Sequence, residues 1–377
     1  MKTALVYDWL NIKIGGGEQT FFEIAEQFPE ADIYCLVYNK KLFSKYLKNR
    51  KVITSRLNKF PMFMKSRPYL LLPHIQKAVD KLDFDGYDLV ISVSSAWVKN
   101  ITVPETTCHI SYCFSPARML WDSWPKYLDT QKLGPFKLGP ISQFIITRRV
   151  SKLRLWDFYQ SENVDQFIAI SHYIADRIQK YYHRKSALVY PPVKIFNIPK
   201  MNTPRDYFLC VSTLSHYKNI ELVIRTFIKR KEKLIIAGDG PDRERLEKIA
   251  QNYSNIEFVG RVSDENKIQL LQGAKAFIFP GLEDFGIAPV EALSTGTPVI
   301  ALYGGGLLET VQDGKTGLFF TRETVTSLNE SIDKFNQLSF DRRLLHQTAE
   351  KFSQDKFNAE FPKLISKMYK DYENEKK

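Results

Sequence analysis

Residues 279–293 read Phe279-Pro280-Gly281-Leu282-Glu283-Asp284-Phe285-Gly286-Ile287-Ala288-Pro289-Val290-Glu291-Ala292-Leu293. A β-rich apolar run over residues 276–279 ends at Pro280-Gly281, and a helix is predicted to begin near Ile287. Pro289 falls in the first turn of that helix, where proline is tolerated because the first helical N–H groups lack partners within the helix. The stretch therefore predicts a strand, a loop and a helix whose N-terminal amides favour anions and hydroxyl oxygens.

Two carboxylates, Glu283 and Glu291, stand eight positions apart in this stretch. A carboxylate accepts two hydrogen bonds, so one of them could hold vicinal hydroxyls of a hexose and the other those of a ribose. Simpler alternatives stay open at this point. Glu283 and Asp284 could only cap the helix, and Glu291 could be a solvated helical residue.

The alternation of strand and helix extends along most of the chain. Strands are predicted over 4–7, 31–37, 89–93, 109–113, 166–170 and 187–190, and in a second series over 207–212, 233–237, 256–259, 276–279, 298–301 and 317–319. Helical patterns lie between them, for example over 173–181, 220–228, 243–251 and 265–273. Strands that alternate with helices predict parallel sheets, and two such series predict two doubly wound domains.

The expected fold class is therefore α/β, with two Rossmann-like domains over 1–195 and 206–350. A Pro-containing segment, 194–205, reads as the linker between them. A helical pattern in 351–377 is a candidate to cross back onto the first domain. Ligands of open parallel sheets bind outside the carboxyl ends of the strands, so the cleft between two such domains is the expected site.

Composition sets limits on the class of protein. The chain has 377 residues, 44% of them hydrophobic, which suits two cores, and it lacks the run of about 18 apolar residues that a spanning helix needs. Its four cysteines are expected to be buried free thiols in a reducing, cytoplasmic compartment; they are Cys35, Cys108, Cys113 and Cys210. No CxxC, no Cys/His ligand spacing and no Asp-x-Asp flanked by apolar strands occurs. We expect neither a metal nor a cofactor.

The net charge is +12, which favours anionic partners. Residues 40–79, here called the basic segment, contain no Asp or Glu but eleven cations: Lys40, Lys41, Lys45, Lys48, Arg50, Lys51, Arg56, Lys59, Lys65, Arg67 and Lys77. Bulky apolar residues such as Phe60, Met62 and Phe63 lie among them, a mixture that predicts contact with an anionic membrane surface. A solvated basic face is the alternative. No RNA-binding fold is recognisable, so nucleic acid is not an expected partner.

Eight further motifs occur in a fixed order along the chain. They are Gly15-Gly16-Gly17-Glu18, the stretch from Ser115-Pro116 through Arg118 to Trp121-Asp122, Ala169-Ile170-Ser171, Tyr190-Pro191-Pro192-Val193, Tyr217-Lys218-Asn219, Gly238-Asp239-Gly240-Pro241, Gly260-Arg261-Val262-Ser263-Asp264 and Gly304-Gly305-Gly306. Together with residues 283–291, their order and spacing resemble family 4 retaining glycosyltransferases of the GT-B fold over nearly the whole chain. Within that family the chain is most similar to bacterial mannosyltransferases of O-antigen and exopolysaccharide assembly.

The resemblance implies a site for a nucleotide-sugar donor. Glu283 and the amides of Phe285 and Gly286 would bind the hydroxyls of the sugar, with Ile287 beside them. Glu291 would accept hydrogen bonds from the ribose.

The resemblance also assigns Lys218 to the diphosphate, where a positioned cation stabilises the charge of the leaving group. The family usually carries an arginine five residues earlier, but here Thr213 occupies that position. Arg261 is the candidate for the missing second cation.

Two glycine motifs extend the implied site. Gly16 and Gly17 follow the first strand and match a loop that closes over the β-phosphate and the acceptor, since glycines let the backbone approach a phosphate closely. Glu18 could touch acceptor hydroxyls or cap its own helix. Residues 304–306 resemble a glycine loop near the donor, with a flexible connector as the alternative.

The acceptor side departs from the family at Phe114, where related mannosyltransferases often have a histidine. Arg118 and Asp122 remain candidate acceptor-side groups, and so does His172, which follows a predicted strand end. His109 is expected to be a core histidine.

The implied reaction moves a hexose, with retention and without a metal, from a nucleoside diphosphate sugar to a lipid-linked or growing polysaccharide acceptor. GDP-mannose is the favoured donor, and the enzyme is expected on the cytoplasmic face of the cell membrane. Two alternatives stay open: a UDP-hexose donor, and a catalytically idle GT-B partner subunit, which Thr213 and Phe114 would favour.

Overall fold

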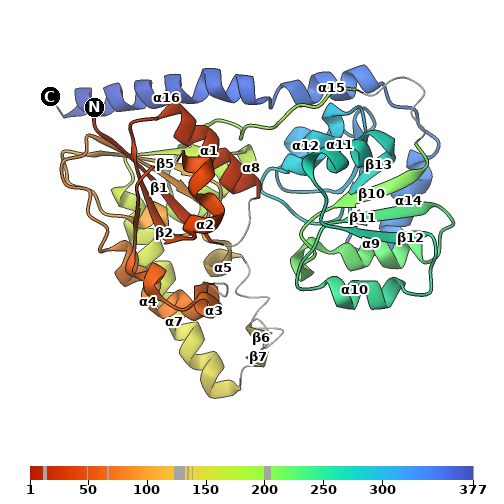
Figure 1. Cartoon of the computed structure of the whole chain (residues 1–377), viewed down its shortest axis with the longest axis horizontal. Coiled ribbons are helices and arrows are strands. Elements are labelled where there is room, and N and C mark those ends of the chain that lie inside the picture. The colour runs from red at the N-terminus through yellow and green to blue at the C-terminus, as the bar shows by residue number, and fades with distance from the viewer. Residues whose placement is uncertain are drawn as a thin grey trace. The chain divides into compact units, whose positions relative to one another are not determined.

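The chain forms two compact units, Met1–Tyr190 with Asn358–Lys377, and Pro191–Phe357 (Figure 1). The structure, a computed structural model, describes residues 1–11, 15–48, 50–65, 68–122, 132–133, 136–137, 139–198 and 205–376. We call the two parts unit 1 and unit 2 and describe each by itself.

Unit 1 is built on a seven-stranded parallel sheet with the strand order β3-β2-β1-β4-β5-β8-β9. Its strands are β1 (Thr3–Leu10), β2 (Asp32–Tyr38), β3 (Val52–Thr54), β4 (Leu89–Ser94), β5 (Cys108–Cys113), β8 (Gln166–Ala169) and β9 (Ser186–Leu188). Most side chains on both faces of the central strands are buried, as expected for a parallel sheet covered by helices on both sides. A separate antiparallel pair joins β6 (Lys132–Leu133) to β7 (Phe136–Lys137).

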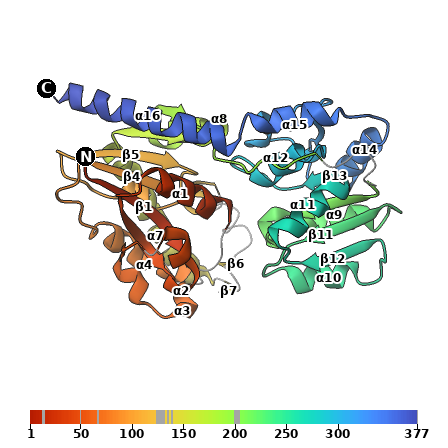
Figure 2. The same ribbon diagram turned by 45° about the horizontal axis from the view of Figure 1, so that its top comes forward.

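Helices cover the sheet of unit 1. They are α1 (Gly16–Gln27), α2 (Lys40–Phe43), α3 (Met62–Lys65), α4 (Pro68–Val79), α5 (Arg118–Trp121), α7 (Pro140–Gln160) and α8 (His172–Tyr182), with 3₁₀ turns η1 (Ser44–Leu47), η2 (Arg56–Lys59), η3 (Val98–Asn100) and η4 (Ser161–Asn163). The C-terminal helix α16 (Gln354–Glu375) lies along this unit from Asn358 onward (Figure 2). There the Phe361 ring packs edge-on against Tyr112 at 5.3 Å, and the Tyr372 hydroxyl donates to the Glu105 carbonyl at 2.7 Å.

The strand order of unit 1 reverses direction between β1 and β4, the point at which doubly wound sheets bind ligands. Here the buried carboxylate of Asp8, on β1, fills the amide-rich turn after β4. It accepts hydrogen bonds from four consecutive backbone amides, those of Ser95, Ala96, Trp97 and Val98, at 2.7–3.0 Å. The amides that could bind an anion at the switch point of unit 1 are therefore already bonded to a carboxylate of the chain itself.

Unit 2 contains a six-stranded parallel sheet with the strand order β12-β11-β10-β13-β14-β15. Its strands are β10 (Tyr207–Val211), β11 (Lys233–Ala237), β12 (Ile256–Gly260), β13 (Ala274–Phe279), β14 (Val299–Leu302) and β15 (Gly317–Phe320). Its helices are α9 (Ile220–Phe227), α10 (Arg243–Ala250), α11 (Asp264–Gly273), α12 (Ile287–Ser294), α13 (Leu307–Thr310), α14 (Val325–Phe335) and α15 (Arg342–Glu350), with a 3₁₀ turn η5 (His216–Lys218). The order reverses between β10 and β13, so the loops after these two strands flank the expected ligand site.

The predicted fold class is confirmed, because both series of strands form parallel sheets with the expected alternation. The two units divide at Tyr190 and Asn358, several residues from the predicted boundaries at 195 and 350. In the predicted linker, residues 194–198 form no helix or strand, and 199–204 lie outside the described residues. The four cysteines are buried and free, as predicted. None of the described helices combines the length and apolar character needed to cross a bilayer.

Candidate functional site

The candidate site of unit 2 lies where the loops after β10 and β13 meet. The first loop runs from Ser212 into the turn η5, and the second runs from Pro280 to Gly286 at the start of α12. The two loops are in contact, because a Cβ added to Gly281 would lie 3.5 Å from the Lys218 backbone. The fold therefore brings together the motifs of Lys218 and Gly281, which are 63 residues apart in the sequence.

Lys218 and Glu283 form a direct ion pair in this loop contact, and both side chains are half-buried. The Lys218 ammonium also lies over the rings of Tyr217 and Phe279, at 5.1 and 5.6 Å from their centroids. Aromatic faces stabilise a cation without neutralising it. The predicted diphosphate cation and the predicted sugar-binding carboxylate are thus immediate neighbours.

The N-terminus of α12 presents the backbone of Phe285 and Gly286 beside this pair. Gly286, the N-cap of α12, has φ +97°, a conformation that glycine adopts at little cost. A Cβ at this position would also lie 2.4 Å from Leu307 Cδ2 of α13. The partial positive charge of a helix N-terminus favours oxygen atoms of anions and hydroxyls at this point.

The glycine loop at 304–306 packs against the loop that carries Glu283. The Gly306 amide donates to the Glu283 carbonyl at 2.9 Å, and a Cβ on Gly306 would lie 2.4 Å from the Asp284 carbonyl oxygen. These contacts hold the backbone of the carboxylate loop in place, which makes the glycine loop more than a flexible connector.

Glu291 is buried, with 6% of its surface exposed, so it is not the solvated helical residue that the sequence left as an alternative. Its Oε1 atom accepts a hydrogen bond from Lys267 Nζ of α11 at 2.7 Å. Burial raises the pKa of Glu291, and the positive charge of Lys267 opposes that increase. Lys267 was not predictable as a partner of Glu291, because no motif links a lysine on one helix to a carboxylate 24 residues later on another.

The two remaining donor-side positions differ in their surroundings. Thr213 is half-buried, and the next residue, Leu214, donates its amide to the Asp239 carbonyl at 3.1 Å. Arg261 is exposed and directly follows β12, the edge strand, which β11 separates from β10. The predicted second cation therefore comes from a strand that is not adjacent to the one preceding Lys218.

In unit 1, α1 begins at Gly16, and residues 12–14 just before it lie outside the described residues. Gly17 packs closely on the ring of Phe114 and on the Tyr7 hydroxyl, which a Cβ would meet at 3.2 and 2.9 Å. Glu18 accepts a hydrogen bond from the Gly15 amide at 2.8 Å, so its carboxylate caps α1.

Phe114 belongs to a buried aromatic cluster. Its ring packs edge-on against Tyr7 and Tyr112, with centroids 6.5 and 5.5 Å apart. A phenylalanine suits this apolar position beside the glycine loop, and the histidine of related proteins would need a polar partner here.

Besides Glu18 on α1, the predicted acceptor-side residues lie on or beside two elements. Arg118 is the half-buried first residue of α5, and His172 is the exposed first residue of α8. Asp122 accepts hydrogen bonds from Arg177 and, at 2.5 Å, from the Tyr181 hydroxyl, which ties the end of α5 to α8. His109 is buried on β5, as expected for a core histidine.

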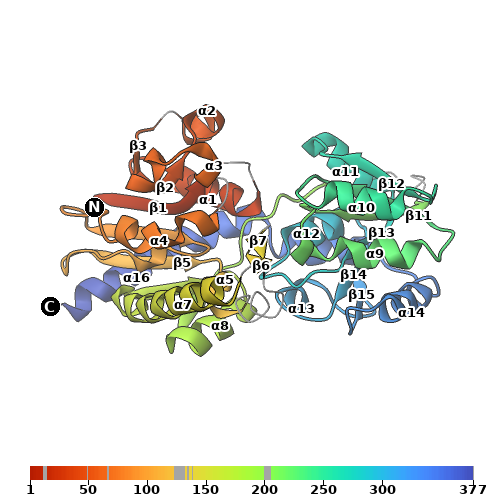
Figure 3. The same ribbon diagram turned by 90° about the horizontal axis from the view of Figure 1, so that it is seen from below.

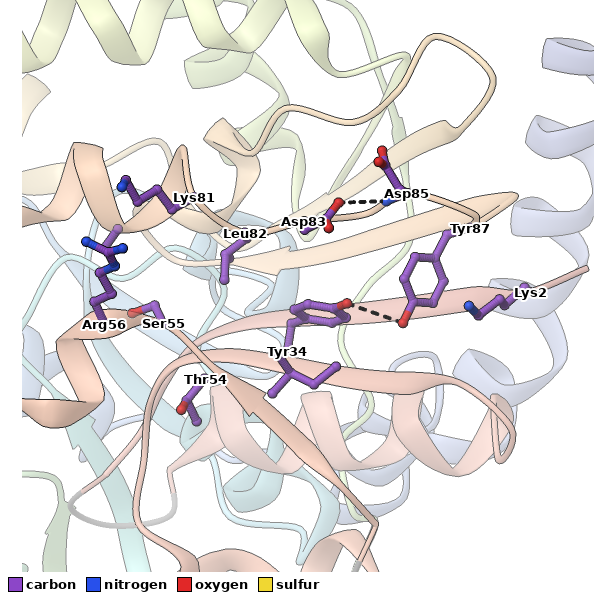
Figure 4. Close-up of a pocket in the computed structure, with 12 residues that line it drawn as sticks. Lys2, Tyr34, Thr54, Ser55, Arg56, Lys81, Leu82, Asp83, Asp85 and Tyr87 are labelled. Atoms are coloured by element: carbon purple, nitrogen blue, oxygen red, sulfur yellow. Dashed lines mark hydrogen bonds between the residues drawn. The ribbon is translucent and has the colours of Figure 1, made fainter.

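A separate pocket of unit 1 lies near the amino ends of β1 and β4 (Figure 4). Its polar groups already contact one another: the Tyr87 hydroxyl donates to Asp32 at 2.6 Å, the Tyr34 hydroxyl donates to that of Tyr87 at 3.3 Å, and Lys2 Nζ lies 4.4 Å from the centre of the Tyr87 ring. None of the predicted site residues lines it. Doubly wound sheets bind ligands at the opposite, carboxyl ends of the strands. Among the residues that the structure describes, no cluster of His, Cys, Asp or Glu could hold a metal ion.

Comparison with known proteins agrees with this geometry. Residues 193–352 match the family described as glycosyl transferases, group 1. The alpha-1,3/1,6-mannosyltransferase ALG2 of Mus musculus is 25% identical over 56% of this chain and 60% of its own length. The D-rhamnosyltransferase WbpZ of Pseudomonas aeruginosa is 28% identical over 41% of this chain and 46% of its own length. The matched segments thus span about half the length of these curated relatives.

Among solved structures, Anabaena HepE in complex with UDP superposes with a TM-score of 0.68, at 16% identity, over 97% of this chain and 100% of that chain. This similarity extends the fold to both units. Residues 193–352 therefore resemble the group 1 glycosyl transferases, and the two parallel-sheet units share the GT-B fold with the solved structures that the chain matches.

Proposed function

We propose that this protein is a retaining glycosyltransferase that moves a hexose from a nucleoside diphosphate sugar to a glycan acceptor. The observation that carries the proposal is the ion pair between Lys218 and Glu283 at the switch point of unit 2, beside the N-terminus of α12. A cation for a diphosphate, a carboxylate for sugar hydroxyls and helix N-terminal amides are the groups that such a donor requires.

The proposed roles follow from the contacts of each group. Glu283 and the amides of Phe285 and Gly286 bind the sugar hydroxyls, with Ile287 as the first residue of α12 beside them. Glu291, buried and ion-paired with Lys267, is a fixed acceptor for the ribose hydroxyls.

Lys218 stabilises the charge that develops on the diphosphate as the bond from the anomeric carbon to the phosphate oxygen breaks. The acceptor oxygen forms its bond on the same face of the sugar, and the leaving phosphate takes the acceptor proton. Arg261 is the proposed second cation, and Gly16 and Gly17 approach the β-phosphate. The proposed reaction uses no metal and no cofactor.

GDP-mannose is the proposed donor, and the similarity to ALG2, named as a mannosyltransferase, supports a mannosyl donor. A UDP-hexose is the second candidate, which the fold similarity to HepE in complex with UDP-glucose favours. A screen of thermal unfolding with GDP-, UDP-, ADP- and dTDP-sugars tests both. The true donor raises the unfolding temperature most, because a ligand that binds only the folded state stabilises it by mass action. No stabilisation by any of the four would overturn the donor site.

The proposed acceptor is a lipid-linked or growing polysaccharide in cell-surface glycan synthesis. Glu18, Arg118, Asp122 and His172 are the proposed acceptor-side candidates; of these, Glu18 also caps α1 and Asp122 also ties α5 to α8.

Such an acceptor calls for attachment to the cytoplasmic face of the membrane, and the basic segment is the proposed contact with anionic lipid. Among its described cations, Lys48 pairs with Glu26, Arg50 donates to the carbonyls of residues 25, 28 and 29, and Lys65 donates to a carbonyl at 3.2 Å. Lys45 Nζ lies 4.8 Å from the centre of the Tyr46 ring. Four of the cations that are exposed are Lys40, Lys41, Lys45 and Lys51.

A catalytically idle partner subunit is the second class of function, suggested by Thr213 and Phe114. Slow hydrolysis of the donor separates the two classes. An enzyme releases GDP or UDP from its own donor, whereas an idle subunit binds the donor and releases neither.

A further inference from the structure

Helix α7 is apolar on two sides, and among the residues that the structure describes only its inner side packs on the core of unit 1. Its inner side contributes Val150, Leu153 and Trp156 to the core of unit 1. The same core includes Leu71, Leu72 and Ile75 of α4, and Arg149 of α7 donates to the Pro73 carbonyl at 2.8 Å, so α7 and α4 lie side by side (Figure 3). A helix that only covers a core exposes polar residues on its outer side.

The outer side of α7 instead exposes four large apolar residues. Phe144 is 66% exposed, Ile145 61%, Leu155 58% and Tyr159 61%. At 3.6 residues per turn these four project within an arc of about 120°, along about 22 Å of helix. Several large apolar side chains exposed on one face of a helix are a candidate interaction surface.

The charges on this side indicate what the partner is. Arg148, Ser151 and Lys152 are exposed in the same arc, between the apolar residues. The only acidic residue of α7 is Asp157, which is buried and ion-paired with Lys99 at 2.5 Å. The outer side of α7 therefore combines apolar and cationic groups without a carboxylate, which is the composition of helices that lie in the interface of an anionic bilayer.

We infer that α7 is the element by which unit 1 inserts into anionic membrane lipid, with Phe144, Ile145, Leu155 and Tyr159 in the acyl boundary and Arg148 and Lys152 at the phosphates. This inference deepens the proposed attachment to the membrane. The sequence predicted that apolar residues of the basic segment contact the lipid, whereas this inference assigns that contact to α7. Aromatic rings and long cationic side chains can both reach the headgroup level from one helix face.

Cosedimentation of the full chain with vesicles tests the inference without any sugar nucleotide, so its outcome is independent of glycosyl transfer. Vesicles of phosphatidylcholine alone are compared with vesicles that also contain phosphatidylglycerol. The double variant Phe144→Ser, Leu155→Ser is expected to bind the anionic vesicles at least about tenfold more weakly than the wild type. The double variant Arg148→Gln, Lys152→Gln is expected to bind anionic vesicles roughly 30-fold more weakly than the wild type. Its binding to vesicles of phosphatidylcholine alone should not change.

Matched exposed residues of unit 2 provide the controls: Tyr253→Ser with Leu338→Ser, and Lys229→Gln with Lys231→Gln. Both control variants are expected to bind like the wild type. Wild-type sedimentation of the two α7 variants, with unchanged thermal unfolding, would overturn the inference. It would also be overturned if the wild type were a dimer that Phe144→Ser, Leu155→Ser dissociates, because the outer side of α7 would then bind a second copy of the chain.

Discussion

Lys218 and Glu283 form an ion pair, so the two groups proposed to contact the donor hold each other in position. Replacing Lys218 by Ala is expected to lower kcat by roughly 10²-fold, the typical loss on removing one electrostatic donor to the leaving group. The readout is donor turnover under saturating donor. Lys229→Ala, at an exposed position of unit 2, is the control and should turn over like the wild type. Wild-type turnover of Lys218→Ala would exclude the proposed role.

Glu291, the proposed acceptor for the ribose hydroxyls, is expected to give donor binding a pH dependence. Burial raises its pKa above 4.5, the ordinary value for a glutamate, and only the ionised carboxylate accepts both ribose hydrogen bonds. Affinity for the nucleoside diphosphate is therefore expected to fall as the pH drops through this raised pKa. Lys267→Met removes the opposing positive charge, so in this variant the loss should begin at a higher pH.

Isothermal titration with the nucleoside diphosphate over a pH series measures this effect. Glu291→Gln should bind weakly at every pH and show a flat profile in the same range. A wild-type profile as flat as that of Glu291→Gln would mean that Glu291 does not titrate in the site.

At the scale of elements, the start of α12 depends on a glycine for two separate reasons. Gly286→Ala would place a side chain at φ +97° and bring its Cβ to 2.4 Å from Leu307. Strain and overpacking together are expected to cost about 2–4 kcal/mol of the free energy of unfolding. Gly314→Ala is the matched control, since Gly314 has φ +72° with nothing within 4 Å of the added Cβ. Measured by urea unfolding, Gly314→Ala should lower the free energy of unfolding by less, about 1–2 kcal/mol. Equal losses for the two variants would mean that the Leu307 side chain moves away without cost.

The elements show how far the sequence could be interpreted. Alternating apolar runs and helical patterns predicted the parallel sheets, because each strand is short, apolar and followed by a helix. The same reasoning gave no prediction of α7, since its apolar residues face both the core and the solvent and leave no single stripe. Short edge elements such as β3 also escaped prediction, because three residues carry little periodicity.

The candidate site was predictable where a motif joins chemistry to a strand end, as at Glu283 and Lys218. It was not predictable where the partner of a site residue lies on another helix, as Lys267 does for Glu291. Nor was it predictable where a candidate side chain forms a structural contact within the fold. Glu18 and Asp122 are examples of the second kind, because capping and interhelical contacts depend on three-dimensional neighbours.

At the scale of the whole molecule, the donor contacts proposed for the ion pair and for α12 all belong to unit 2. Hydrogen exchange in the presence of the nucleoside diphosphate is therefore expected to slow in residues 212–219 and 280–292, where loops and a helix start surround the site. The amino-end pocket of unit 1 around Tyr34 and Tyr87 serves as the internal reference and should exchange at an unchanged rate. Protection at that pocket instead would place the nucleotide in unit 1.

The Asp8 carboxylate at the switch point of unit 1 has a consequence for stoichiometry. Two Rossmann-like units could in principle take two nucleotides per chain. In unit 1, however, four backbone amides already have an anion that is covalently part of the chain, at no cost in translational entropy. A phosphate group in solution would have to displace the Asp8 carboxylate from these four amides. Titration calorimetry is therefore expected to find one equivalent of nucleoside diphosphate per chain. A second equivalent would show that the ligand displaces the Asp8 carboxylate from these amides.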